Sequence, residues 1–251
     1  MSCSHPELSD TRVLITGAAA RIGKTTAQHL ADCGADVAIH YRSSEEPARR
    51  LRDELNDQGI TCEILQADLT DVDELSDLVA RADDAIGPIN ALVNNAAIWR
   101  DTPFGDVTHS QWDALFDTNL RAPFFLTQQF ANRAADRPGA CVVNLVDVFG
   151  KRPLVGYSAY GMTKAALWYM TEVLAAELAP HIRVNGIAPG TVLLNEDHDA
   201  GMADELDERI PMGLTGGPKD VAETIGFLIS GPSYITGEVI AVDGARRHIA
   251  D

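Results

Sequence analysis

The chain has 251 residues, of which 45% are hydrophobic and 23% are charged, as is usual for a soluble globular protein. Its formal net charge of −17 argues against binding to nucleic acid, which needs a basic surface, and against docking on anionic lipid. We expect a cytoplasmic protein, because no stretch approaches the ~20 apolar residues of a membrane span and the four cysteines resemble no zinc site.

Short apolar runs alternate with helical patterns along the chain. We expect strands at 12–16, 35–40, 61–66, 89–95, 140–146, 182–188 and 238–242. We expect helices from Ile22, over 44–57, from Asp71, over 112–135 with Pro123 as a candidate kink, over 157–179 and over 219–230. Because the strands are mostly continuous apolar runs, this pattern predicts one α/β domain over residues 1–251. We expect this domain to have a Rossmann-type, doubly wound parallel sheet of seven strands, with helices on both faces.

A glycine-containing turn, TGAAARIG (16–23), connects the first strand to the first helix. Such a turn suits a pyrophosphate, because glycine lets the backbone approach and helix N–H groups point at the anion. Only Gly17 and Gly23 are glycine, and Arg21 stands where another glycine is expected. On this segment alone, an ordinary strand–helix turn is equally compatible.

The second strand ends in HYRSS (40–44), without the acidic residue that would bind the ribose 2′-hydroxyl of NAD. Arg42 is suited to a 2′-phosphate, and Arg21 adds positive charge. The nearby Glu45 and Glu46 fall on a starting helix, where acids complement the helix dipole. We therefore predict NADPH rather than NADH, the alternative being that Arg42 is a solvated surface residue.

Tyr160 and Lys164 are four positions apart in a segment with a helical pattern, so they share one face. An ammonium near a phenol favours the phenolate, so we expect the pKa of Tyr160 to lie below its usual value of about 10. Tyr160 would then be a usable proton donor near neutral pH. The alternative for the pair alone is a contact on the surface of an amphipathic helix.

These motifs, with NNAA (94–97), Asn119 and IAPG (187–190), resemble the short-chain dehydrogenase/reductase superfamily from Val13 to Gly244. The resemblance implies that Lys164 also binds the nicotinamide ribose, that Asn119 holds a proton-relay water and that Asp68 contacts adenine. The coenzyme-binding residues that it implies are Gly17, Arg21, Ile22, Gly23, His40, Tyr41, Arg42, Ser43, Asp68, Leu69, Asn95, Ala96, Tyr160, Lys164, Pro189 and Gly190.

Asp147 departs from the pattern of most of the superfamily, which carries a serine thirteen positions before the tyrosine. That serine donates a hydrogen bond to the substrate carbonyl oxygen. An ionised Asp147 cannot donate, and in a dry site it would repel developing negative charge by several kcal/mol. A C=N bond is different, because its nitrogen takes a proton that a carboxylic acid beside Tyr160 could supply.

In this departure the chain resembles pteridine reductases of this superfamily, which carry an arginine in the glycine turn and an aspartate in place of the serine. This resemblance implies catalysis by Asp147, Tyr160, Lys164 and Asn119. It also implies a substrate site of Arg21, Trp99, Asp147 and Tyr160, with the pterin stacked on Trp99. Ala97 differs from pteridine reductases that carry serine there.

The resemblance further implies a homotetramer built through the helix at 166–178, and the acidic segment 195–209 is a candidate substrate lid. The histidines are scattered, so we expect no metal site. The favoured prediction is an NADPH-dependent dihydropteridine reductase. The alternatives are a general short-chain reductase of a 3-oxoacyl carrier thioester or small alcohol, and a non-catalytic NADP-binding regulator.

Overall fold

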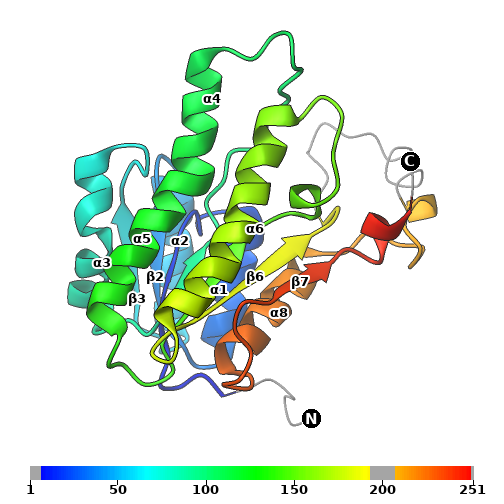
Figure 1. Cartoon of the computed structure of the whole chain (residues 1–251). Coiled ribbons are helices and arrows are strands. Elements are labelled where there is room, and N and C mark those ends of the chain that lie inside the picture. The colour runs from blue at the N-terminus through cyan, green and yellow to red at the C-terminus, as the bar shows by residue number, and fades with distance from the viewer. Residues whose placement is uncertain (1–6, 193–206, 250–251) are drawn as a thin grey trace.

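The computed structural model describes residues 7–192 and 207–249, which form a parallel sheet between two layers of helices (Figure 1). The predicted fold class is confirmed. The strands are β1 (Arg12–Ile15), β2 (Asp36–Tyr41), β3 (Cys62–Gln66), β4 (Ala91–Asn94), β5 (Cys141–Leu145), β6 (Arg183–Pro189) and β7 (Val239–Val242). The helices are α1 (Arg21–Asp32), α2 (Glu45–Asp57), α3 (Val72–Ile86), α4 (His109–Phe116), α5 (Ala122–Ala134), α6 (Ser158–Leu178) and α8 (Pro218–Ser230), with short turns η1 (Asp117–Arg121), η2 (Val148–Gly150) and η3 (Arg246–His248).

The seven strands lie in the order β3-β2-β1-β4-β5-β6-β7, and every pair is parallel. The order reverses between β1 and β4, where Val13 pairs with Ala91. In an open parallel sheet, ligands bind beyond the carboxyl ends of the strands at such a switch point. The topology therefore places the ligand crevice beside the turn that follows β1.

Each face of the sheet packs against its own set of helices. Alternate side chains of a strand point to opposite faces, so Val13 and Ile15 contact the core under α1, α2 and α8, while Leu14 contacts the core under α3, α5 and α6. Both sets of side chains are fully buried. This two-sided burial explains why the strands are nearly continuous apolar runs.

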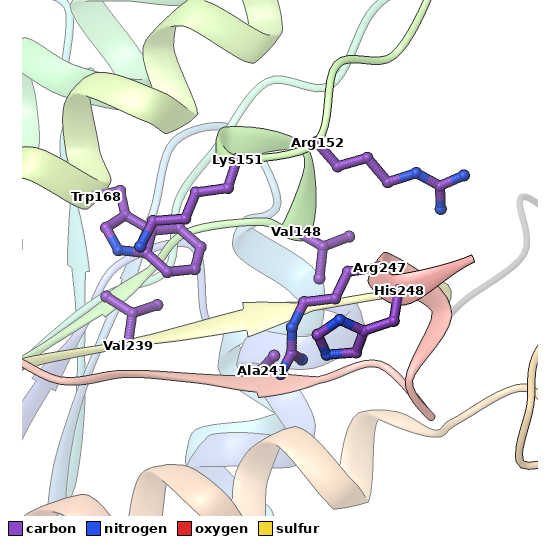
Figure 2. A pocket seen from close by; sticks show the side chains of 8 residues that line it. All are labelled: Val148, Lys151, Arg152, Trp168, Val239, Ala241, Arg247 and His248. Carbon is purple, nitrogen blue, oxygen red and sulfur yellow. The ribbon is translucent and has the colours of Figure 1, made fainter. Parts of the chain in front are cut away.

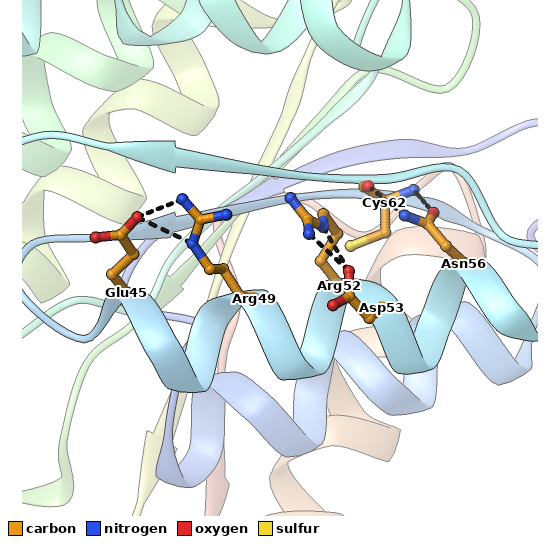
Figure 3. Close-up of polar contacts among 6 residues, drawn as sticks. All are labelled: Glu45, Arg49, Arg52, Asp53, Asn56 and Cys62. Atoms are coloured by element: carbon orange, nitrogen blue, oxygen red, sulfur yellow. Dashed lines mark hydrogen bonds and ion pairs between the residues drawn. The ribbon is translucent and has the colours of Figure 1, made fainter.

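Local polar contacts fix where the helices begin and how they dock. Asp71 caps α3 by accepting from the N–H groups of Asp73 and Glu74. Figure 3 shows α2, where Glu45 binds Arg49 one turn on and Asn56 makes two hydrogen bonds to the main chain of Cys62 in β3.

The helix expected over 112–135 differs from the observed structure. Thr108 and Gln111 form a capping box, so α4 begins at His109. A π-turn, Asp117–Arg121, then separates α4 from α5, and the N–H of Ala122 bonds to the carbonyl of Asp117. Pro123 has no N–H, and its ring would clash with a carbonyl four residues earlier. The wider turn accommodates this proline at the start of α5.

The structure bears only in part on two expectations, the acidic substrate lid and the lack of a membrane span. Residues 195–206 of the acidic segment proposed as a lid lie outside the described residues. Within residues 7–192 and 207–249, every helix is too short or too polar to span a bilayer.

Candidate active site

The turn after β1 is tied to the segment after β4 by side-chain hydrogen bonds. The Thr16 hydroxyl accepts from the N–H groups of Asn95 at 3.0 Å and Ala96 at 2.9 Å. The Asn95 amide in turn donates to the carbonyls of Thr16 at 2.8 Å and Gly17 at 3.1 Å. The two motifs TGAAARIG and NNAA therefore meet at the switch point of the sheet.

Gly17 and Gly23 are required by this close approach. Gly17 has φ 64°, and a Cβ there would lie 3.0 Å from the Cα of Ala96. A Cβ on Gly23 would overlap the carbonyl oxygen of Gly17 and come within 2.6 Å of the Asn95 amide nitrogen. Arg21, where the sequence suggested a third glycine, has φ 53°, a left-handed conformation that costs a non-glycine residue on the order of 1 kcal/mol.

The start of α1 fits the pyrophosphate of a dinucleotide. Its N-cap residue, Ala20, makes no side-chain hydrogen bond, so no cap side chain occupies the first N–H groups of the helix. Ala20 and Arg21 are exposed, and Ile22 is half-buried. An anion at this position would meet the N–H groups of the first helical turn and the positive end of the helix dipole.

The segment after β2 divides into buried and exposed residues. His40 is buried: its Nδ1 accepts from the N–H of Gly17 at 3.1 Å, so its Nε2 carries the proton and donates to the carbonyl of Ala67 at 3.0 Å. Burial lowers the pKa of His40 to about 4, so the ring is neutral at pH 7. The imidazole thus fastens β2 to the glycine turn, a structural role that the sequence did not reveal.

The remaining residues predicted to bind the adenosine end fall into two groups. Arg42 and Ser43 are exposed beyond β2, as a contact to a 2′-phosphate requires. The side chains of Tyr41 and Leu69 belong to the core, so only their main chains can face a ligand. Asp68 is half-buried, and its carboxylate accepts from the N–H and hydroxyl of Thr70.

Asp147 and Tyr160 form the central contact of the site. Asp147 follows β5 and caps η2, because its Oδ1 accepts from the N–H of Phe149 at 2.9 Å. The Tyr160 hydroxyl, from the first turns of α6, donates to Asp147 Oδ2 at 2.6 Å. The acid at the usual serine position therefore points at the phenol, and the two groups are joined by a short hydrogen bond.

Burial raises the pKa of Asp147 above its ordinary value, against the hydrogen bonds from Phe149 and Tyr160 and the charge of Lys164. Burial and the Asp147 carboxylate raise the pKa of Tyr160 well above 10.0. The expectation that Lys164 lowers the pKa of this phenol is wrong here. The physical reason is that burial disfavours the phenolate and that an acid, and not the ammonium, is the hydrogen-bond partner of the hydroxyl.

Lys164 lies beneath this pair. Its Nζ donates to the carbonyl of Leu145 at 2.9 Å and lies 5.9 Å from the centre of the Tyr160 ring. Burial lowers the pKa of Lys164 to about 8, although Asp147 acts in the opposite direction. The ammonium therefore acts on the Tyr160 hydroxyl through its electrostatic field and not through a direct hydrogen bond.

Asn119 belongs to the π-turn and holds the segment after β4 in place. Its side chain accepts from the N–H of Ile98 at 2.8 Å and donates to the carbonyl of Ile98 at 2.9 Å and to the Thr163 hydroxyl at 3.2 Å. Thr163 donates in turn to the carbonyl of Tyr160. The predicted proton-relay water of Asn119 stays a prediction, whereas this positioning network is observed.

Trp99 follows the NNAA segment after β4, and 48% of its surface is exposed. Its ring stacks on Tyr157 with centroids 4.8 Å apart, and Tyr157 meets Tyr160 edge-on at 6.5 Å. The main chain of Thr102 bridges to Tyr157, and its carbonyl accepts from the Ser158 hydroxyl. Tyr157, the N-cap residue of α6, was not predicted as a site residue, although the helix expected over 157–179 puts it three residues before Tyr160 and so on the same face.

The remaining predicted residues lie at the same edge of the sheet. Pro189 ends β6, and Gly190 follows with its N–H bonded to the carbonyl of Val242. A Cβ on Gly190 would lie 2.8 Å from the Cβ of Asp243. Among residues 7–192 and 207–249, no group of acidic, histidine and cysteine side chains is arranged to hold a metal ion.

Comparisons with known proteins agree with this arrangement. A family described as enoyl-(acyl carrier protein) reductase matches residues 17–245. The 3-oxoacyl-[acyl-carrier-protein] reductase FabG of Staphylococcus aureus is 34% identical over 237 residues, 92% of this chain and 96% of that protein. The chain belongs to the short-chain dehydrogenase/reductase superfamily.

Other superfamily members carry different names. Gluconate 5-dehydrogenase of Gluconobacter oxydans is 34% identical over 96% of this chain and 97% of its own length. The crystal structure of FolM alternative dihydrofolate reductase 1 from Brucella canis, complexed with NADP, has a TM-score of 0.92 and 32% identity, covering 97% of this chain and 96% of that one. The superfamily and its fold are thus shown, and the choice of substrate depends on the site.

Proposed function

We propose that the protein is an NADPH-dependent reductase of a dihydropteridine or dihydrofolate ring. The observation that carries this proposal is the 2.6 Å hydrogen bond between the Tyr160 hydroxyl and the Asp147 carboxyl group. A site that reduces a ketone needs neutral donors aimed at an oxygen that becomes negative. A partly buried acid beside the tyrosine instead supplies a proton to nitrogen.

The residues present fit NADPH. The uncapped start of α1 and the approach at Gly17 and Gly23 suit the pyrophosphate, and the exposed Arg42 suits the 2′-phosphate. We assign the nicotinamide ribose to Lys164. When bound, NADPH supplies the hydride that reduces the ring C=N at carbon. The protein's own contribution is to hold the ring and to deliver one proton to its nitrogen.

Asp147 and Tyr160 together supply that proton. Burial raises the pKa of both groups, so each holds its proton at a higher pH than it would in water. When a proton leaves the pair, the remaining negative charge is shared across their hydrogen bond and stabilised by the Lys164 ammonium nearby.

Trp99 and Arg21 are the proposed substrate-binding residues. Tyr157 supports one side of the Trp99 ring and leaves the residue half-exposed, so a flat heterocycle can stack on the free part of the indole. Arg21 holds a left-handed backbone conformation at the start of α1. The strain at this position is explained if its guanidinium contacts the substrate and the coenzyme phosphate.

The relative named as an alternative dihydrofolate reductase supports this proposal. A spectrophotometric assay tests it, by following NADPH oxidation with dihydrobiopterin, dihydrofolate, a 3-oxoacyl thioester and simple ketones under one set of conditions. We expect kcat/KM for a pterin or folate to exceed that for every ketone by at least about 100-fold, equivalent to ~2.7 kcal/mol. Equal or faster turnover of the thioester would reject the proposal.

The second candidate is a 3-oxoacyl carrier thioester reductase. It is favoured by the FabG relatives and by the description of the matching family. It requires Asp147 to be tolerated where a neutral donor is needed, and the same assay decides between the two. A non-catalytic NADP-binding protein would show coenzyme binding without turnover of any substrate.

We also propose that the protein is a cytoplasmic homotetramer. Large aromatic side chains are exposed on the surfaces of α4, α5 and α6: Trp112, Phe124, Phe125 and Tyr169. Trp112 stacks on Phe116, and Phe124 packs edge-on against Phe125, so the rings form ordered clusters. Clusters of this kind suit a symmetric contact with a second copy of the chain.

A further inference from the structure

A cavity of about 360 Å³ lies between the turn after β5, helix α6 and strand β7 (Figure 2). Neither Asp147 nor Tyr160 lines it, and the proposed reaction uses none of its side chains. Its size is in the range of cavities that hold small ligands. The lining residues are Val148, Lys151, Arg152, Trp168, Val239, Ala241, Arg247 and His248.

The charged residues in the lining are all basic, which is unexpected in a chain with net charge −17. Lys151 comes from the turn after β5 and points toward Trp168, whereas Arg247 comes from η3 and points toward Ala241 of β7 (Figure 2). Their carboxylate partners are outside the lining: Glu172 lies 3.9 Å from Lys151, and Asp243 lies 2.9 Å from Arg247. Among the described residues, the lining therefore presents N–H donors and contains no carboxylate of its own.

The rest of the lining is apolar. Val239 and Ala241 of β7, with Val148 of η2, form an aliphatic wall, and the Trp168 ring lies beneath the Lys151 ammonium at 4.1 Å (Figure 2). Basic groups beside apolar and aromatic surface suit a ligand with two parts. One part is an anion that accepts from Lys151 and Arg247, and the other is a compact apolar body.

The cavity shares its turn with the active site. The N–H groups of Lys151 and Arg152 both donate to the carbonyl of Val148, at 3.1 Å and 3.0 Å. Asp147 precedes Val148 and caps the same turn. An occupant that contacts Lys151 and Val148 therefore contacts the turn that carries the acid of the active site.

We propose that this cavity binds a small organic carboxylate, whose apolar body rests on Val148, Val239 and Ala241 and whose carboxylate lies between Lys151 and Arg247. Binding does not depend on which substrate the enzyme reduces. A monoanion of this class matches the volume, the N–H donors and the apolar wall together. A bare anion matches only the donors.

Calorimetric titration of the intact protein, with NADP⁺ present throughout, tests the proposal. The probes are indole-3-acetate, its neutral amide indole-3-acetamide, and acetate. We expect indole-3-acetate to bind at least about tenfold more tightly than either of the others, because only it offers both a carboxylate and an apolar body. Equal binding of the amide would overturn the proposal, and so would a titration without heat, as when a second copy covers this face.

Substitutions in the cavity lining test where indole-3-acetate binds. Lys151→Gln and Arg247→Gln should each weaken binding of indole-3-acetate about tenfold or more, whereas Lys151→Arg should retain it. Arg50→Gln is the matched control, since it removes one exposed cation of α2 that lies outside the cavity lining. Unchanged binding in both Lys151→Gln and Arg247→Gln, each shown to be folded by circular dichroism, would place the ligand elsewhere and overturn the proposal.

Discussion

Asp147 decides the character of the active site at the scale of single residues. A serine at this position would donate a hydrogen bond, whereas the aspartate accepts one from Tyr160 at 2.6 Å. The sequence predicts the presence of this acid and its distance along the chain from the tyrosine. It does not predict the pKa of the phenol, because that depends on which group the hydroxyl contacts and on how deeply both groups are buried.

The pH dependence of reduction should follow the proton of Lys164. Burial lowers the pKa of this ammonium to about 8, so the charge is present below that pH and is lost above it. Because the charge stabilises the Asp147–Tyr160 pair after proton transfer, kcat/KM should fall as the pH rises through about 8, approaching tenfold per pH unit. Lys164→Arg, which keeps its charge, should not show this fall. A flat profile in the wild type between about pH 7 and pH 10 would contradict this role.

Substitution of Arg21 should separate the stability of the protein from its activity. Its φ of 53° favours glycine, so Arg21→Gly should leave the free energy of unfolding unchanged or raise it by about 1 kcal/mol. The same change should lower kcat/KM for a dihydropteridine about tenfold or more, because the cation is lost from the site. Chemical denaturation and steady-state kinetics on the same preparation measure both. Full activity with increased stability would remove Arg21 from the substrate site.

At the scale of elements, the alternation of strands and helices was predictable, and the connection between α4 and α5 was not. The β-strands are continuous apolar runs, so their positions follow from the sequence to within a residue or two. The π-turn before Pro123 was not predicted, because the sequence marks Pro123 only as a candidate kink and does not show how the preceding turn is wound. Its consequence is the placement of Asn119 against Ile98 and Thr163.

The contact of η2 with α6 controls the position of Asp147. A Cβ on Gly150 would lie 2.9 Å from the carbonyl oxygen of Lys164. Gly150→Ala should therefore destabilise the protein by about 1–3 kcal/mol and lower activity, because the turn that carries Asp147 must move. Thermal unfolding and the NADPH assay measure the two effects.

Gly161→Ala is the matched control for that substitution. Its Cβ would meet only the carbonyl oxygen of Phe149, at an ordinary 3.7 Å, and the residue lies within α6. We expect it to stabilise the protein by about 0.5–1 kcal/mol, as alanine does within a helix. Equal effects of the two alanines on stability and activity would show that the approach of η2 to α6 does not position the acid.

At the scale of the whole molecule, the net charge of −17 and the exposed aromatic clusters act together. Charge repulsion opposes association of like copies, and salt weakens that repulsion over a Debye length of about 10 Å at 0.1 M. Burial of four aromatic rings per chain favours association. We expect burial of the aromatic rings to outweigh the charge repulsion, because the rings are clustered whereas the charges are spread over the surface.

Light scattering after size exclusion tests the proposed tetramer. We expect the mass of four chains of 27.0 kDa at moderate salt, and dissociation to smaller species in the double variant Trp112→Ser with Phe124→Ser. Phe104→Ser is a control, because that ring is 94% exposed and lies outside α4, α5 and α6. A wild-type mass of a single chain, 27.0 kDa, would contradict the tetramer without affecting the proposed reaction.

The preference of the wild type and of Asp147→Ser for two substrates tests the central claim most directly. The measured quantity is the ratio of kcat/KM for dihydrobiopterin to kcat/KM for a 3-oxoacyl thioester, with NADPH saturating. We predict a ratio far above one in the wild type and a fall of at least about 100-fold in the variant, since a serine hydroxyl donates to oxygen and holds no acidic proton for nitrogen. An unchanged ratio in Asp147→Ser, or a wild-type preference for the thioester, would contradict the claim that this acid sets the chemistry of the site.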